Sequence, residues 1–398
     1  MTMTFGPSPS VERALHSGDV SLPATMTPRL SDIDWRWALP RILLVFLVTR
    51  LMVVVVIAVT DVTYPELAPP EHLVSDDRPL VSTLTAYDGV WYRGIAEDGY
   101  HAEIERYPDY AFYPLYPLAI RAASLLTLGD SSLATLLVSN LAFLVALFAL
   151  YALSVRYLAP DRAMLGLWLL GLAPGAVAFT LAYTESLFLL LAVAAFLAAE
   201  LRRHWLAGIL VALATLARPT GILLVLPLAL LYLQRSDWRP TRALFPLVVA
   251  PLAWLVWFVY VWWMTGDPMA TFDAQSYWDP AAYAASRDEV GSADPRFLPQ
   301  GPAVLLYLLV ILFYFFSLVW VQPDRFPHAY RLVVVVFIGS LLLAGRADSA
   351  VRDLAVAWPT YWGVAIRESA LGRAAVLALF TASQVFLLWY IATWNWLP

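Results

Sequence analysis

The stretch AYDGVWYRGIAEDGYHAE (residues 86–103) places charged and aromatic side chains in a chain that is otherwise dominated by apolar runs. It follows the first strongly apolar segment and comes before AFYPLYPLAIR (residues 111–121). Its acid Asp88 stands between two tyrosines and a tryptophan. A carboxylate beside hydrocarbon is unfavourable unless it has a partner or a function. The stretch therefore predicts a membrane fold that carries polar chemistry at its surface.

The composition of the whole chain agrees with a membrane fold. Of the 398 residues, 61% are hydrophobic and only 14% are charged, compared with about 25% charged residues in a typical soluble protein. We predict an all-α polytopic membrane protein with about 11 transmembrane helices and with interfacial helices in its first extracytoplasmic loop. The apolar runs place the spans near 39–60, 131–155, 163–181, 185–200, 205–217, 219–234, 243–264, 302–321, 331–345, 354–366 and 374–393.

The first part of the chain differs from the rest. Residues 1–38 are rich in Pro, Ser and Thr and lack an apolar core. We interpret them as a flexible cytoplasmic N-terminal tail rather than a signal peptide. Residues 39–398 then form the transmembrane domain. The absence of cysteine excludes disulfides and thiolate chemistry.

Arginines in the short loops predict the orientation of the domain, because cytoplasmic loops are enriched in basic residues. With the N-terminus in the cytoplasm, residues 61–130 form the first extracytoplasmic loop and residues 265–301 form a second large one. These two loops contain most of the acids. The arrangement requires residues 112–126 to lie in the interface rather than to span, which their Arg121 and two prolines favour. The unusual polar residues then meet on the extracytoplasmic face of a cell membrane.

The opening stretch reads as a short amphipathic helix that begins at Asp88. Trp91, Tyr92 and Ile95 repeat at helical spacing, and Gly99 suits the helix end. Asp88 has two readings: an N-cap, or a general base placed where a lipid headgroup and a polar acceptor meet. The aromatic residues also have two readings, because a sugar-binding surface and a membrane belt use the same side chains. As sugar-binding candidates they are Tyr87, Trp91 and Tyr92.

A second carboxylate opens the apolar run LAYTESLFLLL (residues 181–191). Glu185 is either a first-turn acid that interacts with the helix dipole or a partner of Asp88 on the same face. A glutamate so close to hydrocarbon needs a partner in either case. Tyr183, two residues earlier, is a further candidate for substrate binding.

The segment LARPTGILLVLPL (residues 216–228) contains a break between two short predicted helices, and Arg218 lies at this break. Pro219 suits the first position of a helix, and the free N–H groups of such a helix start bind anions. Arg218 is therefore a candidate phosphate ligand, and its alternative is a snorkelling or structural arginine. Arg352 and Arg93 are secondary candidates for the same phosphate.

The outer loop TGDPMATFDAQSYWDP (residues 265–280) adds Gln275 and Trp278 as substrate-binding candidates. The chain has no HExxH motif and no Gly-rich phosphate loop, and its five histidines are scattered. A single DxD pattern, Asp32 to Asp34, falls in the predicted cytoplasmic tail. We therefore expect no metal, no cofactor and no nucleic-acid partner.

Several of these stretches together resemble one family, the PIG-V mannosyltransferases in their bacterial branch. The similarity covers about residues 84–280. Towards the C-terminus the family's Ser-x-x-Arg-Tyr element is matched only by Ser349 and Arg352, with Asp353 in place of the aromatic residue. The motifs that carry the resemblance are AYDGVWYRGIAEDGY, FYPLYPLAIR, SNLAFLVALFALYAL, YTESLFLLLAVAAF, LARPTGILLVLPL and TGDPMATFDAQSYW.

The resemblance implies a C-type glycosyltransferase that takes its sugar from a polyprenyl-phosphate carrier and keeps its catalytic acid in the first extracytoplasmic loop. Asp88 is the acid in that loop. The implied donor is a β-linked polyprenyl-phosphate mannose, used as a substrate, and the implied product is an α-mannoside formed with inversion. Glu185 would assist Asp88, and Arg218 would stabilise the departing phosphate. The acceptor would be a glycolipid or another component of the cell envelope, alongside the membrane lipids.

Two alternatives to a mannosyltransferase remain open at this point. A transporter or flippase of a lipid-linked or anionic solute also uses broken helices and arginines, but it usually places its charges near the midplane of inverted repeats. A C-type transferase of another sugar, such as arabinose, has the same general features. Neither the oligomeric state nor a membrane partner subunit can be read from the sequence.

Overall fold

The structure, a computed structural model, describes residues 30–64, 76–103, 108–276, 302–322, 324–344, 349–367 and 369–394. Within these ranges every regular element is a helix, which confirms the all-α prediction. The four helical stretches that are long and apolar enough to cross a membrane are α2 (Trp35–Thr63), α6 (Ser131–Ser154), η7 with α11 (Arg242–Val248 and Val249–Thr265) and α18 (Ala370–Ala392).

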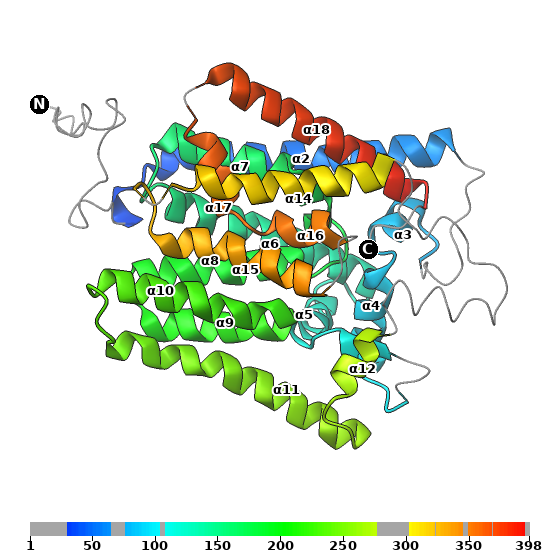
Figure 1. The fold of residues 1–398 in the computed structure, drawn as a ribbon. Helices are drawn as coiled ribbons and strands as arrows, with labels where there is room; N and C mark the ends of the chain where they lie inside the picture. The colour runs from blue at the N-terminus through cyan, green and yellow to red at the C-terminus, as the bar shows by residue number, and fades with distance from the viewer. Residues whose placement is uncertain are drawn as a thin grey trace, which may run out of the picture.

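Shorter helices pack beside these four and run in roughly the same direction (Figure 1). Four further apolar helical stretches of 10–17 residues are found in the described ranges, so the predicted number of 11 spans is not confirmed. The shorter helices of the bundle are α7 (Pro160–Leu172), α8 (Glu185–Glu200), α9 (His204–Ala217), α10 (Val225–Arg235), α14 (Pro302–Trp320) and α15 (His328–Ala344).

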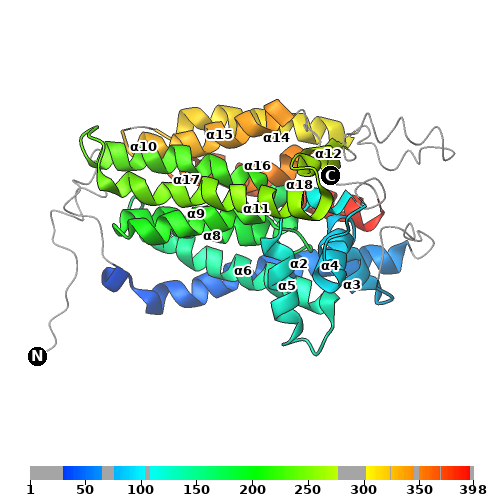
Figure 2. The same cartoon turned by 90° about the horizontal axis from the view of Figure 1, so that it is seen from below.

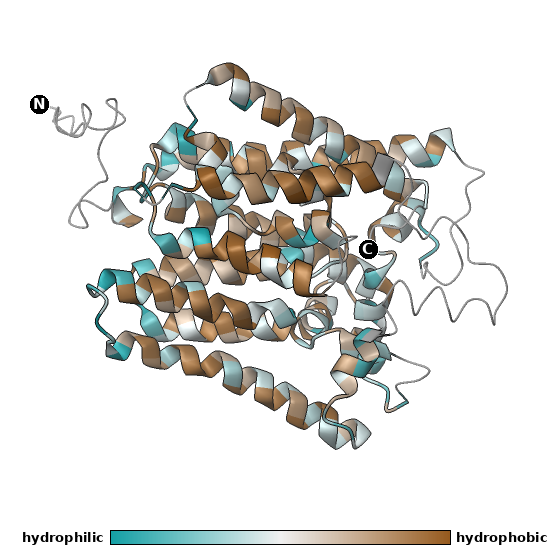
Figure 3. Cartoon of the chain, viewed as in Figure 1, coloured by the Kyte–Doolittle hydropathy of each residue, from teal (hydrophilic) through white to brown (hydrophobic). Residues whose placement is uncertain are grey.

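The outside of the bundle is apolar. Figure 3 shows hydrophobic residues along α11 and α14. On α11 the side chain of Val256 is 66% exposed and that of Trp263 is 78% exposed, and Leu308 and Phe316 are exposed on α14. Soluble proteins rarely expose apolar surfaces of this extent. These faces therefore lie against lipid, and the protein is a membrane protein.

The two ends of the bundle differ in structure. The short helices of the first loop gather at one end together with α12 (Ala270–Ser276), whereas α2 begins at the other end (Figures 1 and 2). A ten-residue helix is about 15 Å long, half of the hydrocarbon core, so α5 is too short to span, as the sequence predicted. The helices of the first loop are α3 (Pro79–Leu84), α4 (Asp88–Asp98), η4 (Pro108–Ala111) and α5 (Leu115–Ser124).

Two predicted spans are interrupted by proline. The span predicted over 163–181 is α7 followed by a separate 3₁₀ segment, η5 (Pro174–Phe179). The span predicted over 354–366 falls on two short helices, α16 (Ala350–Ala355) and α17 (Pro359–Ala365). Ala173, before Pro174, is extended, as the residue before a proline usually is. Pro359, at the start of α17, lacks the N–H that a continuing helix needs. The first break comes before Tyr183 and Glu185 in the chain, and the second comes after Arg352 and Asp353.

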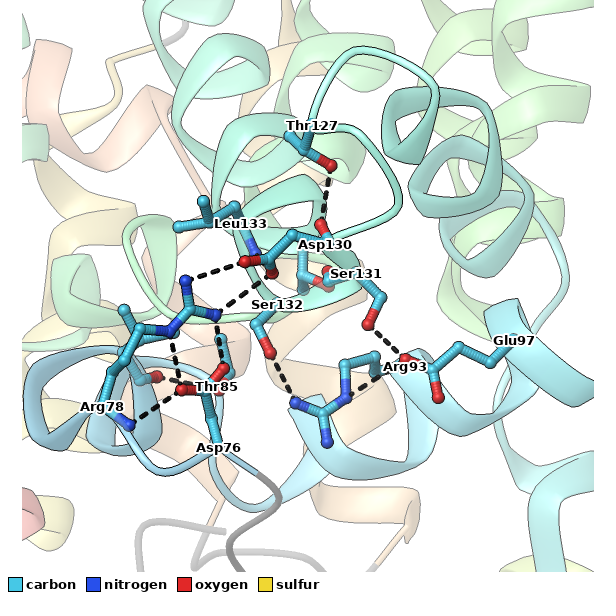
Figure 4. Close-up of polar contacts among 12 residues, drawn as sticks. Asp76, Arg78, Thr85, Arg93, Glu97, Thr127, Asp130, Ser131, Ser132 and Leu133 are labelled. Carbon is cyan, nitrogen blue, oxygen red and sulfur yellow. Dashed lines mark hydrogen bonds and ion pairs between the residues drawn. The ribbon is translucent and has the colours of Figure 1, made fainter.

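A polar cluster anchors the first loop to the start of α6 (Figure 4). Arg78 Nη2 lies 2.6 Å from Asp76 Oδ2, and its Nη1 lies 2.7 Å from Asp130 Oδ2. Asp130 is also the N-cap of α6, because its Oδ1 accepts the N–H of Leu133 at 2.9 Å. The cluster therefore joins α3 to α6 through one arginine.

We expect Asp130→Ala to lower the free energy of unfolding by about 1 kcal/mol, because it removes an N-cap. Hydrogen bonds from Arg78 lower the pKa of Asp130. A lowered pKa means that the stabilisation is present above the ordinary pKa of the carboxyl group and is lost as the pH falls through the lowered one. Thermal unfolding in detergent at pH 7 and below pH 4 measures this effect. Asp130→Asn, which keeps a capping side chain, should lose less; equal losses in both variants would contradict the role of the cap.

Candidate active site

Asp88 is held at the start of α4 by an unusual backbone turn. Tyr87 precedes it with φ of 57°, a conformation that is costly for a residue with a side chain. The Tyr87 hydroxyl donates to the carbonyl oxygen of Ile391 at 3.4 Å, and its ring packs against Trp394. Tyr87 takes the cap position, so the N-cap reading of Asp88 is wrong. The helix ends before Gly99 as predicted.

Close backbone approach brings Asp88 towards the segment that precedes α8. A Cβ atom added at Gly89 would lie 2.6 Å from Ala182 Cβ, so only glycine allows this contact. Ala182 N also donates to Leu84 O at 2.9 Å. These contacts place the start of α4 beside the chain that leads into Glu185.

A second close approach brings in α16 from the C-terminal part of the chain. A Cβ atom added at Gly175 in η5 would lie 1.9 Å from the carbonyl oxygen of Val351. The absence of a side chain therefore lets α16 pack directly on η5. The next two residues of α16, Arg352 and Asp353, enter the site in this way.

Five charged side chains form a continuous set, called the charged network below. Arg352 Nη1 donates to Asp88 Oδ2 at 2.6 Å, and Arg352 Nε lies 3.2 Å from Glu185 Oε1. Arg218 Nη1 donates to the same Glu185 oxygen, and Arg218 Nη2 donates to Asp353 Oδ1. The network thus connects Asp88 to Arg218 through Arg352 and Glu185.

The acidic side chains of the charged network differ in their exposure to solvent. The side chain of Glu185 is 1% exposed, that of Asp88 is 21% exposed and that of Asp353 is 28% exposed. Three carboxylates and two guanidinium groups leave a formal charge of minus one. Buried charges are tolerated only when they are paired and hydrogen-bonded, and both arginines pair with two or more carboxylates. Arg218 is therefore held inside the protein by two ion pairs and does not extend to the interface, and Glu185 both opens α8 and pairs with two arginines.

Aromatic side chains surround the charged network on the α4 side. The guanidinium carbon of Arg352 lies 4.9 Å from the centre of the Tyr183 ring, a cation–π distance. Tyr92 packs edge-to-face against Phe112 at 5.0 Å, and burial raises its pKa. Trp91 stacks on the same Phe112 at 5.9 Å. The site therefore combines charged groups with neutral aromatic surface.

Other predicted site residues lie elsewhere. Arg93 Nη1 donates to Ser132 Oγ at 2.6 Å, and its Nε lies 3.7 Å from Glu97 Oε1, beside the Asp130 cluster (Figure 4). Gln275 lies on α12, which packs against η4. Trp278 lies outside the described residues. In the described ranges no group of three or more His, Asp or Glu residues is arranged to hold a metal ion.

The structure adds two details to the sequence interpretation of the network. A helix begins at Pro219 as predicted, and its first six residues form a 3₁₀ segment, η6 (Pro219–Leu224), that continues into α10. Asp353 was interpreted as a departure from the family pattern, but it binds Arg218. An acid beside Arg352, next to an apolar segment, was the signal that could have identified it.

An apolar cavity of about 360 Å³ lies between α4, α5, α9 and α11. Two of its lining residues, Leu118 and Val256, are exposed on the outside of the bundle. A third, Leu216, precedes Arg218 by two residues. The cavity therefore reaches the lipid-facing surface, and one residue of its wall is close in the chain to Arg218. Its lining includes Ile95, Tyr100, Leu118, Leu216, Val256 and Trp257.

We expect Gly89→Ala to reduce activity by about 10²-fold, because the added Cβ atom would push α4 and Asp88 away from Ala182, and displacements of about 1 Å have effects of this size. Gly94→Ala is the matched control. It lies on the same helix, and an added Cβ atom there would meet nothing within 4 Å. Initial rates of the two purified variants test the prediction; equal rates would contradict the positioning of Asp88 by this contact.

The chain is similar, at low sequence identity, to solved structures from one archaeon. Among solved structures, the oligosaccharyltransferase of Archaeoglobus fulgidus in the apo form is 13% identical, with a TM-score of 0.44, and the match covers 87% of this chain and 55% of that one. The same organism's AglB in complex with an inhibitory peptide and a dolichol-phosphate is 12% identical, with a TM-score of 0.45 and the same coverage. The chain thus spans about half the length of these proteins. No curated protein sequence matches it.

The sequence family is assigned more directly. The model of the family described as Mannosyltransferase (PIG-V) matches residues 36–263, which is more than half of the chain. The matched region contains Asp88, Glu185 and Arg218, and it ends before α16. The chain therefore belongs to the PIG-V mannosyltransferase family, whose members are membrane glycosyltransferases.

Proposed function

We propose that the protein transfers mannose from a polyprenyl-phosphate mannose to a lipid-linked or cell-envelope acceptor, on the extracytoplasmic face and with inversion to an α-mannoside. The observation that carries the proposal is the charged network, in which the carboxylate of Asp88 and two arginines meet near the end of the bundle that holds the first-loop helices. Such a set can act on a hydroxyl group and a phosphate at the same time.

The reaction would be a single displacement. The acceptor hydroxyl oxygen attacks the anomeric carbon of the sugar, and the bond from that carbon to the phosphate oxygen breaks. The phosphate leaves with the electron pair, and Asp88 accepts the hydroxyl proton. Asp88 binds Arg352 through Oδ2, which leaves Oδ1 to face the acceptor. No general acid is needed, because the phosphate leaves as a weakly basic anion.

The arginines would bind the donor phosphate and the charge that develops on it. Arginine suits phosphate because its planar guanidinium donates several hydrogen bonds, and donors held in place before the reaction stabilise the leaving group. Glu185 would assist by holding the two arginines in position, since one of its oxygens contacts both Arg218 and Arg352. The aromatic residues Tyr183 and Tyr92 would contact the sugar.

The apolar cavity would hold part of the prenyl chain of the donor. Its volume lies within the range of about 300–1,000 Å³ for small-molecule sites. Leu216 in its wall precedes Arg218 by two residues in the chain, and Leu118 and Val256 border it on the lipid side. A donor whose phosphate binds Arg218 could therefore enter sideways from the bilayer.

The test is a product identification. Purified protein is given radiolabelled polyprenyl-phosphate mannose and fractionated membrane lipids, and the labelled product is isolated and digested with α-mannosidase. Label in a new product that the enzyme releases would support the proposal. Movement of labelled lipid between leaflets of liposomes without transfer would favour a flippase instead, and transfer from a polyprenyl-phosphate arabinose alone would assign another sugar.

A further inference from the structure

Asp353 occupies an unusual place in the charged network. Its Oδ1 accepts a hydrogen bond from Arg218 Nη2 and lies 3.9 Å from Arg352 Nε. One carboxylate oxygen is thus held between two guanidinium groups. Carboxylate and phosphate oxygens are bound by arginine in the same way, so Asp353 lies where an anionic ligand of both arginines would bind.

The two acids that contact both arginines differ in how easily they could leave. Glu185 is 1% exposed and opens α8, so its release would leave a buried charge without a partner, which is strongly unfavourable. Asp353 is 28% exposed, and its carboxylate can turn towards water with less loss. Glu185 is therefore the permanent counter-ion of the arginines, whereas Asp353 is replaceable.

Charge balance leads to the same conclusion. The network without donor has a formal charge of minus one, from three carboxylates and two guanidinium groups. A donor phosphodiester adds one negative charge, and an excess of minus two would be unfavourable in a partly buried site. When the Asp353 carboxylate turns away from the arginines, the formal charge around them with donor bound returns to minus one.

We propose that Asp353 is a positioning residue that occupies the phosphate subsite before the donor binds and competes with the donor phosphate for Arg218 and Arg352. This inference rests on the proposed function. After transfer the carrier leaves as a phosphate monoester, which has more negative charge than the donor and binds arginine more strongly. Competition by Asp353 then favours release of the spent carrier.

The experiment measures phosphate binding directly. Farnesyl phosphate, a short prenyl monophosphate, is titrated into the purified full-length protein in detergent by calorimetry. Asp353→Asn should bind it about tenfold more tightly, because a charge-assisted contact no longer has to be given up, and the KM for the donor should fall. Asp353→Glu, which keeps the charge, should retain the wild-type affinity. The control Asp98→Asn removes an exposed charge from α4 and should change nothing.

A purely structural role predicts the opposite result, since loss of Asp353 would misplace Arg218 and weaken binding. Unchanged or weaker binding by Asp353→Asn, at a wild-type melting temperature, would overturn the proposal, as would tighter binding by Asp353→Glu. If Asp353→Asn is unstable, Asp353→Ser allows the same comparison. A wild-type protein that fails to bind farnesyl phosphate would instead contradict the proposed function itself.

Discussion

Asp88→Asn is expected to lower the rate of sugar transfer by about 10²–10⁴-fold, the usual contribution of a general base. Asparagine has the same shape as aspartate, and its amide oxygen can still accept the hydrogen bond from Arg352. It cannot accept the proton of the acceptor hydroxyl. The expected loss is therefore in kcat, with little change in the KM for the donor. Initial rates with radiolabelled donor, at saturating acceptor, measure both quantities.

The control for this variant is Asp98→Asn, an equal change of charge at the other end of α4. It should leave the rate unchanged. Both proteins should elute from gel filtration in detergent as the wild type does, so that a lost rate cannot be a lost fold. Full activity of Asp88→Asn would remove Asp88 from the mechanism.

Arg218→Ala is expected to lower kcat/KM by about 10²–10³-fold, because it removes one of the two arginines that we propose stabilise the departing phosphate. It also leaves the buried Glu185 with Arg352 alone, and breaking a buried pair destabilises by about 3–5 kcal/mol. Both rate and melting temperature should therefore fall. Arg218→Lys should recover part of the stability but little of the rate, since an ammonium group cannot reproduce the planar fork that spans two carboxylates.

The matched control is Arg78→Ala, which removes an arginine from the first-loop end of the bundle but outside the charged network. It should lose some stability and retain the rate. A wild-type rate for Arg218→Ala would exclude Arg218 as a phosphate ligand. Full recovery of the rate by Arg218→Lys would show that charge, and not the guanidinium geometry, is what the site requires.

Much of the helix pattern could be predicted because it depends on local features of the chain. The span predicted over 131–155 is α6, and the one over 185–200 is α8. Apolar side chains favour burial or lipid whatever their place in the chain. Gly99 ends its helix because glycine readily adopts a positive φ. The interruptions at Pro174 and Pro359 were missed because the apolar runs continue through both prolines. Hydropathy alone does not detect a change of backbone conformation within an apolar run.

The sequence by itself determined that the protein is a helical membrane protein, and it identified Asp88, Glu185 and Arg218 as candidate site residues, because charges are rare beside apolar runs. Only the tertiary structure decided which side chains pair with these three residues. Arg352 lies 264 positions from Asp88 along the chain. The two residues meet because Gly89 allows α4 to contact Ala182, and Gly175 allows η5 to contact the backbone of α16. Such contacts depend on the three-dimensional fit of distant segments, which no local pattern encodes.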